Sequence, residues 1–174
     1  MKKLLASAVL SLCLMAGTAS AEEFYRKQAG QWTVEGFQKD IAICAASTFW
    51  DNGSYVSFFV SENGAYVMVH NTQWNIGDPP GAFKGYQATL RFFGKYNPDE
   101  GVVDYKLTDN QTVVLLNVNE KFLQAWTKYD TMVILMPGDI GQMTVGLGGT
   151  NAIVSYMGEC LEMAEKVSGP KQNL

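Results

Sequence analysis

Apolar and polar residues alternate over short stretches of this chain, and turn-forming residues separate these stretches. Residues 31–37 alternate in this way, and residues 41–47 place Ala42, Cys44 and Ala46 on one side of an extended segment. A period of two is typical of β-strands. The same pattern predicts strands over residues 54–61, 65–71, 86–93, 102–107, 112–117, 131–136 and 142–147. Closely spaced strands with few helices between them predict an antiparallel β-sandwich or a barrel-like sheet.

The pattern changes near the end of the chain. Over residues 151–167, apolar residues recur every three or four positions, which predicts an α-helix with Ile153, Met157 and Cys160 on its buried face. Thr150 is placed to cap this helix. A short internal helix is expected over residues 120–128, capped by Asn119. Residues 22–28 are polar, and we expect a loose lead-in there.

The first 21 residues read as a secretory signal peptide. Lys2 and Lys3 precede an uncharged apolar run over residues 4–16, and Ala19 and Ala21 give the small-residue pattern that precedes cleavage. An apolar run this short is no membrane span, because a helix needs about 20 residues to cross the bilayer. We therefore expect a periplasmic or secreted protein without a membrane anchor, with residues 22–174 forming a single β-rich domain.

Charge narrows the choice of partners. The full chain carries a net charge of −4, and removal of the two leader lysines makes this −6. A negative charge of this size argues against nucleic acid or anionic lipid as the main partner. The expected partner is a protein or small molecule of unknown identity.

Two cysteines, Cys44 and Cys160, follow the leader, whereas Cys13 lies within it. In an oxidising compartment such a pair usually forms one disulfide. A redox-active pair would lie closer together in sequence, and a zinc site would need further ligands in a chain with a single histidine, His70. We expect the bond to join the C-terminal helix to the strand at residues 41–47, where small neighbours allow close approach.

Catalytic, cofactor and metal sites are not expected. His70 is the only imidazole available as a base, and it falls at the end of a predicted strand. Carboxylates that would suit glycosidic chemistry occur in turn-like sequence, where such residues bond the backbone; these are Asp99, Glu100, Asp130 and Asp139. Glycines at 146, 148 and 149 precede the last helix without a following lysine, which indicates a turn and not a phosphate loop.

Aromatic residues supply one weak candidate for a partner surface. Trp74, Phe83 and Tyr86 lie in or beside a segment rich in proline and glycine at residues 75–85, which is predicted to be a loop. Aromatic side chains at strand ends often close a small core. If they are exposed together, they would form a surface for a partner.

Three stretches carry a resemblance to a known family: residues 30–34 (GQWTV), residues 44–47 (CAAS) and residues 149–160, which end in Cys160. Together with the leader, they resemble the invasion-associated locus B-like proteins of Gram-negative bacteria. The resemblance implies a small periplasmic β-sandwich with no established catalysis. The leading hypothesis is an exported, non-enzymatic binding or accessory protein of the envelope. The alternatives are an inhibitor or immunity protein against a lysozyme or toxin, using residues 74–85 as an inserted loop, and a hydrolase that uses carboxylates.

Overall fold

The computed structural model describes residues 21–39, 41–61, 64–76, 86–108, 111–115 and 120–168. Ten strands form one antiparallel sheet in the order β1-β2-β3-β4-β5-β8-β7-β6-β9-β10. The expected mainly-β fold is therefore confirmed, although the sheet does not close, because β1 and β10 remain its two edges. The strands are β1 (Glu22–Ala29), β2 (Trp32–Gln38), β3 (Ala42–Phe49), β4 (Tyr55–Ser61), β5 (Gly64–His70), β6 (Tyr86–Phe93), β7 (Asp99–Leu107), β8 (Thr112–Leu115), β9 (Thr131–Leu135) and β10 (Gln142–Gly146).

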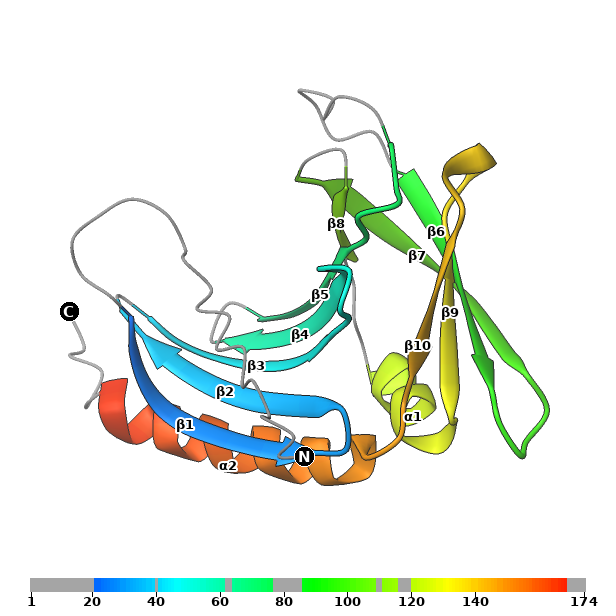
Figure 1. Ribbon diagram of the computed structural model, residues 1–174. Helices are drawn as coiled ribbons and strands as arrows, with labels where there is room; N and C mark the ends of the chain where they lie inside the picture. Colours follow the sequence, from blue (N-terminus) through cyan, green and yellow to red (C-terminus); the bar gives the residue numbers. More distant parts are fainter. Residues whose placement is uncertain are drawn as a thin grey trace, which may run out of the picture.

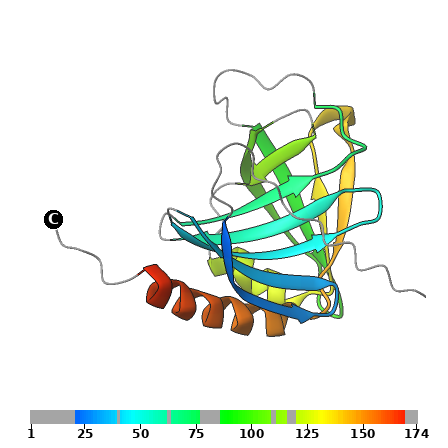
Figure 2. The same cartoon turned by 60° about the vertical axis from the view of Figure 1, so that its left-hand side comes forward.

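Both helices lie on the same face of this sheet. The internal helix α1 (Glu120–Lys128) and the C-terminal helix α2 (Thr150–Ser168) occur where the sequence predicts them, and a 3-10 turn covers Gly138–Ile140. Strands β1–β5 curve strongly, with α2 beneath β1–β3 (Figures 1 and 2). Strands β6, β7, β9 and β10 stand at an angle to this curved part, with α1 at the junction (Figure 1). No helix among the described residues has the length and apolar character needed to cross a membrane.

An aromatic cluster fills the space between the sheet and α1. Trp32 of β2 meets the edge of Trp126 of α1 with ring centroids 5.2 Å apart, and Phe58 of β4 contacts Trp126 and Phe122. Trp32 and Trp126 are 0% and 2% exposed. Burial of such large side chains is the main stabilising contribution to the fold.

The disulfide between Cys44 and Cys160 is confirmed, and it joins β3 to α2 as expected. Both cysteines are fully buried, and the neighbouring Ala46 is buried on the same strand face. Gly36 lies directly opposite Cys44 in the sheet. A Cβ atom on Gly36 would lie 2.9 Å from Cys160 Sγ, so the absence of a side chain there makes room for the bridge.

The expected loose lead-in at residues 22–28 is wrong, because these residues form the edge strand β1. Its polar side chains are held in place on both faces. On the α2 side, Tyr25 donates a hydrogen bond to Glu159 at 3.0 Å, and Lys27 pairs with the same carboxylate. Burial and the Glu159 carboxylate raise the pKa of the Tyr25 hydroxyl. On the other face, Arg26 lies directly opposite Glu35 of β2.

The start of α2 differs from the capping arrangement expected for Thr150. Its hydroxyl lies 2.9 Å from the Trp126 carbonyl oxygen and 2.8 Å from the Leu147 carbonyl oxygen, so it donates to these acceptors and ties α2 to α1. Residues 1–20 of the expected signal peptide (residues 1–21) and the expected cap at Asn119 lie outside the described residues. Ala21 is exposed immediately before β1.

Candidate functional site

Two rows of aromatic side chains cross the sheet on the face of β1–β5 that carries no helix. Pairing between β4 and β5 places Tyr55 opposite His70 and Phe59 opposite Tyr66. The Tyr55 and His70 rings stack with centroids 5.2 Å apart, and the Phe59 and Tyr66 rings stack with centroids 5.0 Å apart. All four side chains are partly exposed. We call this surface, defined by these four residues and the Ser47–Ser57 pair between them, the aromatic sheet face.

Small polar side chains lie between the two aromatic rows. Ser57 falls between Tyr55 and Phe59 along β4 and points to the same face, because alternate residues of a strand share a side. Its hydroxyl lies 2.8 Å from that of Ser47, its cross-strand partner on β3. Both serines are at most 5% exposed. The two aromatic rows are therefore separated by small side chains whose hydroxyl groups bond each other.

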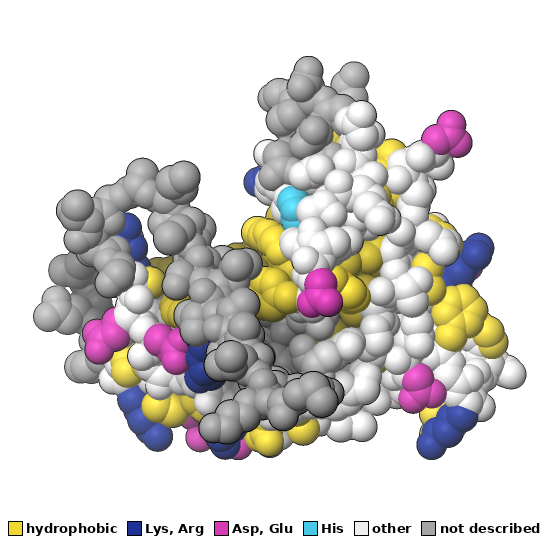
Figure 3. All heavy atoms as spheres, in the orientation of Figure 1, with side chains coloured by type: hydrophobic (Ala, Val, Ile, Leu, Met, Phe, Trp, Pro, Cys, Tyr) yellow, Lys and Arg dark blue, Asp and Glu magenta, His cyan; other side chains and the backbone are white. Residues whose placement is uncertain are grey.

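Figure 3 shows this part of the surface as a hollow whose floor is formed by hydrophobic side chains, in the region where Figure 1 places β3–β5. The cyan group at its margin is His70, since the chain contains one histidine. Nδ1 of His70 lies 2.8 Å from the Thr112 hydroxyl. The imidazole is therefore positioned by a hydrogen bond and by stacking on Tyr55.

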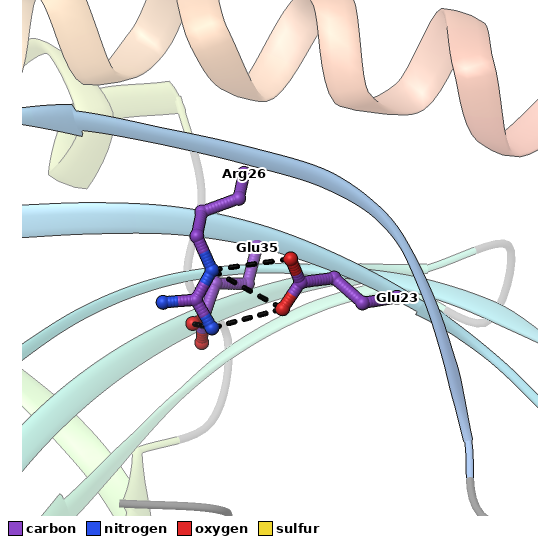
Figure 4. Close-up of polar contacts among 3 residues, drawn as sticks. All are labelled: Glu23, Arg26 and Glu35. Carbon is purple, nitrogen blue, oxygen red and sulfur yellow. Dashed lines mark hydrogen bonds and ion pairs between the residues drawn. The ribbon is translucent and has the colours of Figure 1, made fainter. Parts of the chain in front are cut away.

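A charged group borders the aromatic sheet face at β1 and β2. The Arg26 guanidinium bonds Glu23 at 2.8 Å and Glu35 at 2.5 Å (Figure 4). The hydrogen bond from Arg26 lowers the pKa of the Glu23 carboxyl. Burial raises the pKa of Glu35 despite its contact with Arg26. One cation between two carboxylates leaves this edge with a net negative charge, so it would not favour an anionic ligand.

A second hollow lies on the helix-bearing face, between α1 and the β6–β7 hairpin. This cleft has a volume of about 240 Å³. Its walls include apolar side chains such as Leu90, Phe92 and Phe122, and Lys121 and Asp99 also line it. It is smaller than most small-molecule sites, which occupy about 300–1,000 Å³.

Of the three aromatic residues named as a candidate partner surface, the two that the structure describes are not exposed together. Trp74 is 3% exposed and belongs to the core, which is the alternative that the sequence left open for aromatic residues at strand ends. Tyr86 is half-buried and stacks on Tyr105 with centroids 5.4 Å apart. Phe83 lies outside the described residues, as does most of the loop at 75–85.

Two of the candidate carboxylates are far apart, and a third is already paired. Asp130 and Asp139 lie beyond opposite ends of β9, whose five residues span about 17 Å at the usual rise of a strand. Paired glycosidase carboxylates are separated by only about 5–9.5 Å. Glu100 is bonded to Arg91 at 2.5 Å. Within the described ranges, no group of three or more His, Cys, Asp or Glu side chains is placed to hold a metal ion.

Sequence reasoning missed the aromatic sheet face. Alternation along β4 shows that Tyr55, Ser57 and Phe59 share a side, but it does not reveal which residues of β5 lie beside them. That information comes from the register of the β4–β5 hairpin. A signal was nevertheless present, because both strands carry aromatic residues at alternate positions on the same side.

Comparison with known proteins identifies a similar fold but no family. No family model and no curated protein matches the chain. The structure is similar to the crystal structure of invasion associated protein B from Bartonella henselae, with a TM-score of 0.53 and 10% sequence identity. The match covers 80% of this chain and 98% of that chain. At this identity the similarity concerns the fold, and it agrees with the family resemblance of the sequence.

Proposed function

We propose that the chain is an exported, non-enzymatic binding protein of the bacterial envelope that holds its ligand on the aromatic sheet face. The observation that carries the proposal is the combination of two stacked, partly exposed aromatic pairs with a hydroxyl pair between them. Aromatic rings supply apolar contact area at little cost in side-chain entropy, and hydroxyl groups add directional hydrogen bonds.

The scaffold suits this role because it is rigid around the proposed site. Strand β3 carries Ser47 on the proposed binding face and Cys44 on the opposite face, where the disulfide fixes it to α2. A site on a rigid scaffold loses less conformational entropy when it binds. The structural likeness to a bacterial invasion-associated protein supports an accessory role in bacteria, and a buried disulfide fits an oxidising compartment outside the cytosol.

The geometry supports binding more than catalysis. His70 is held between a ring and a hydroxyl, and no carboxylate lies among the contacts of the aromatic sheet face described above. A general base needs a partner that orients it and a reacting group within hydrogen-bond reach. The residues at this face instead provide shape, apolar contact and hydrogen bonds.

Export is tested by expressing the full chain in a Gram-negative host and analysing the periplasmic fraction. We expect an amino terminus at Glu22 and a non-reduced mass that corresponds to one disulfide. Full-length chain retained in the cytosol with free Cys44 and Cys160 thiols would contradict the exported role.

Ligand binding is tested by titration calorimetry with defined soluble envelope glycans, envelope peptides and lysozyme. For whichever of these ligands binds, we expect Tyr66→Ala and His70→Ala each to weaken the affinity by at least tenfold. Tyr86→Ala is the matched control, because Tyr86 is also a half-buried ring stacked on another ring but lies on the helix-bearing face. Equal losses in all three variants would refute the proposed location.

A further inference from the structure

The turn between β6 and β7, residues 94–98, forms an exposed tip at the lower right of Figure 1. Two aromatic side chains are accessible there, since Phe93 is 38% exposed and Tyr96 is 46% exposed. Most large apolar side chains of a soluble domain are buried, and exposed ones that lie together often mark a contact surface.

Two lysines accompany these rings. The ammonium groups of Lys95, in the turn, and Lys128, in the last turn of α1, lie 5.1 and 5.0 Å from the Tyr96 ring centroid. The two nitrogens are therefore within about 10 Å of each other. In the part of the chain that the structure describes, neither forms an ion pair. The two positive charges repel each other, and an anion close to both would relieve that repulsion.

The tip is held in this arrangement by its neighbours. Tyr129 donates a hydrogen bond from its hydroxyl to the Asn97 carbonyl oxygen at 2.9 Å, and its ring meets the edge of the Tyr96 ring. The backbone N–H of Asp130 bonds the Phe93 carbonyl oxygen at 2.9 Å. The Asp130 carboxylate lies beside Gly94, and Asp99 follows the turn directly in the chain. These contacts fix the turn before any partner arrives.

We propose that this tip, defined by Phe93, Lys95, Tyr96 and Lys128, docks on an anionic phospholipid surface. The charge of the two lysines complements phosphate headgroups, and tyrosine and phenylalanine rings suit the boundary between headgroups and acyl chains. This inference is independent of the ligand site on the aromatic sheet face.

The negative charge of the whole chain does not prevent such docking. At physiological ionic strength the Debye length is about 8 Å, so charges on distant parts of the molecule act weakly at the tip. The local groups therefore decide the interaction; they are the Asp130 carboxylate beside Gly94 and the ammonium groups of Lys95 and Lys128, which form no ion pair among the described residues. The expectation from net charge concerned the main partner, whereas the tip is a local exception.

The test is co-sedimentation of the protein recovered from the periplasm with vesicles of phosphatidylglycerol or of phosphatidylcholine. We expect binding to phosphatidylglycerol vesicles only. A juxtamembrane lysine contributes about fivefold in affinity, so Lys95→Gln or Lys128→Gln should each weaken binding by about fivefold and the double variant by about 25-fold. The matched control is the double variant Lys39→Gln/Lys166→Gln, which removes two exposed lysines elsewhere.

Several results would overturn the proposal. These are absence of sedimentation with phosphatidylglycerol vesicles, equal binding to both lipids, and an equal loss in the control variant. Complete competition by millimolar inorganic phosphate would show a small-anion site in place of a membrane contact. Tyr96→Ser should also reduce sedimentation while Lys95 and Lys128 remain, and unchanged binding in that variant would remove the aromatic part of the inference.

Discussion

Removal of the disulfide is the perturbation whose effect can be worked out most directly from the structure. The bridge closes a loop between residues 44 and 160, which are 116 positions apart. In the chain-entropy model, a cross-link over a loop of this length stabilises the folded state by about 5 kcal/mol, because it restricts the unfolded chain. Small domains are stable by about 5–15 kcal/mol, so we expect the reduced protein to lose a third or more of its stability.

Urea unfolding of the oxidised and the reduced wild-type protein measures this difference. Fluorescence of the buried Trp32 and Trp126 reports the aromatic core, and circular dichroism reports the sheet. Reduction keeps both sulfur atoms in place, so it isolates the cross-link from core packing. The variant Cys44→Ala/Cys160→Ala should be less stable still, because both side chains are fully buried and their truncation leaves space in the core.

The reasoning fails if the oxidised and reduced forms differ by less than about 1 kcal/mol in free energy of unfolding. Such a result would mean that the unfolded chain is already compact, or that α2 remains docked without the bond. Hydrogen exchange in α2 separates the two explanations, since protection lost only in the reduced form would show that docking depends on the bridge.

Four other substitutions test particular contacts. Gly36→Ala should destabilise the fold by about 1–3 kcal/mol, because its Cβ would lie 2.9 Å from the bridged Cys160 Sγ; Gly158→Ala, with nothing within 4 Å of its Cβ, should stabilise α2 by about 0.5–1 kcal/mol, and thermal unfolding measures both. Glu35 has a raised pKa in the folded state, so the native protein binds more protons and loses stability as pH rises from about 4.5 through the folded pKa. Glu35→Gln should therefore flatten this part of the stability profile in urea titrations at several pH values, and an unchanged slope would contradict the assignment. Trp32→Phe should cost about 1–2 kcal/mol, since it removes the indole hydrogen bond to the Gly146 carbonyl oxygen; an unchanged urea midpoint would show that this bond does not contribute.

The elements with a clear period were predictable from sequence. The run at 41–47 reads as an extended segment in which Ala42, Cys44 and Ala46 share one side, so both the strand and the approach of the last helix followed from it. The spacing of Ile153, Met157 and Cys160 likewise located the buried face of α2, and all three are buried. Local pattern and tertiary burial agree at these positions, which is why prediction succeeded there.

Prediction failed where long-range pairing decides the outcome. Strand β1 has only a few apolar residues, and its place in the sheet depends on contacts such as that of Tyr25 with Glu159, which are 134 positions apart. The pairing of β5 with β8 also brings together strands that are separated in sequence by two others. The rows of the aromatic sheet face depend on register in the same way. Such relations between strands leave no periodic signal within any one strand.

The 116 positions between Cys44 and Cys160 also set an order of events when the chain emerges amino terminus first, from a ribosome or through a translocation channel. Cys44 arrives early, and all seven remaining strands and α1 appear before its partner does. Oxidation can thus join Cys44 to Cys160 only after most of the sheet has been delivered, when hydrogen bonding and burial can already bring β3 and α2 together. Until then Cys44 is an unpaired thiol, and the rate of chain delivery determines how long it stays open to reaction with foreign thiols or oxidants.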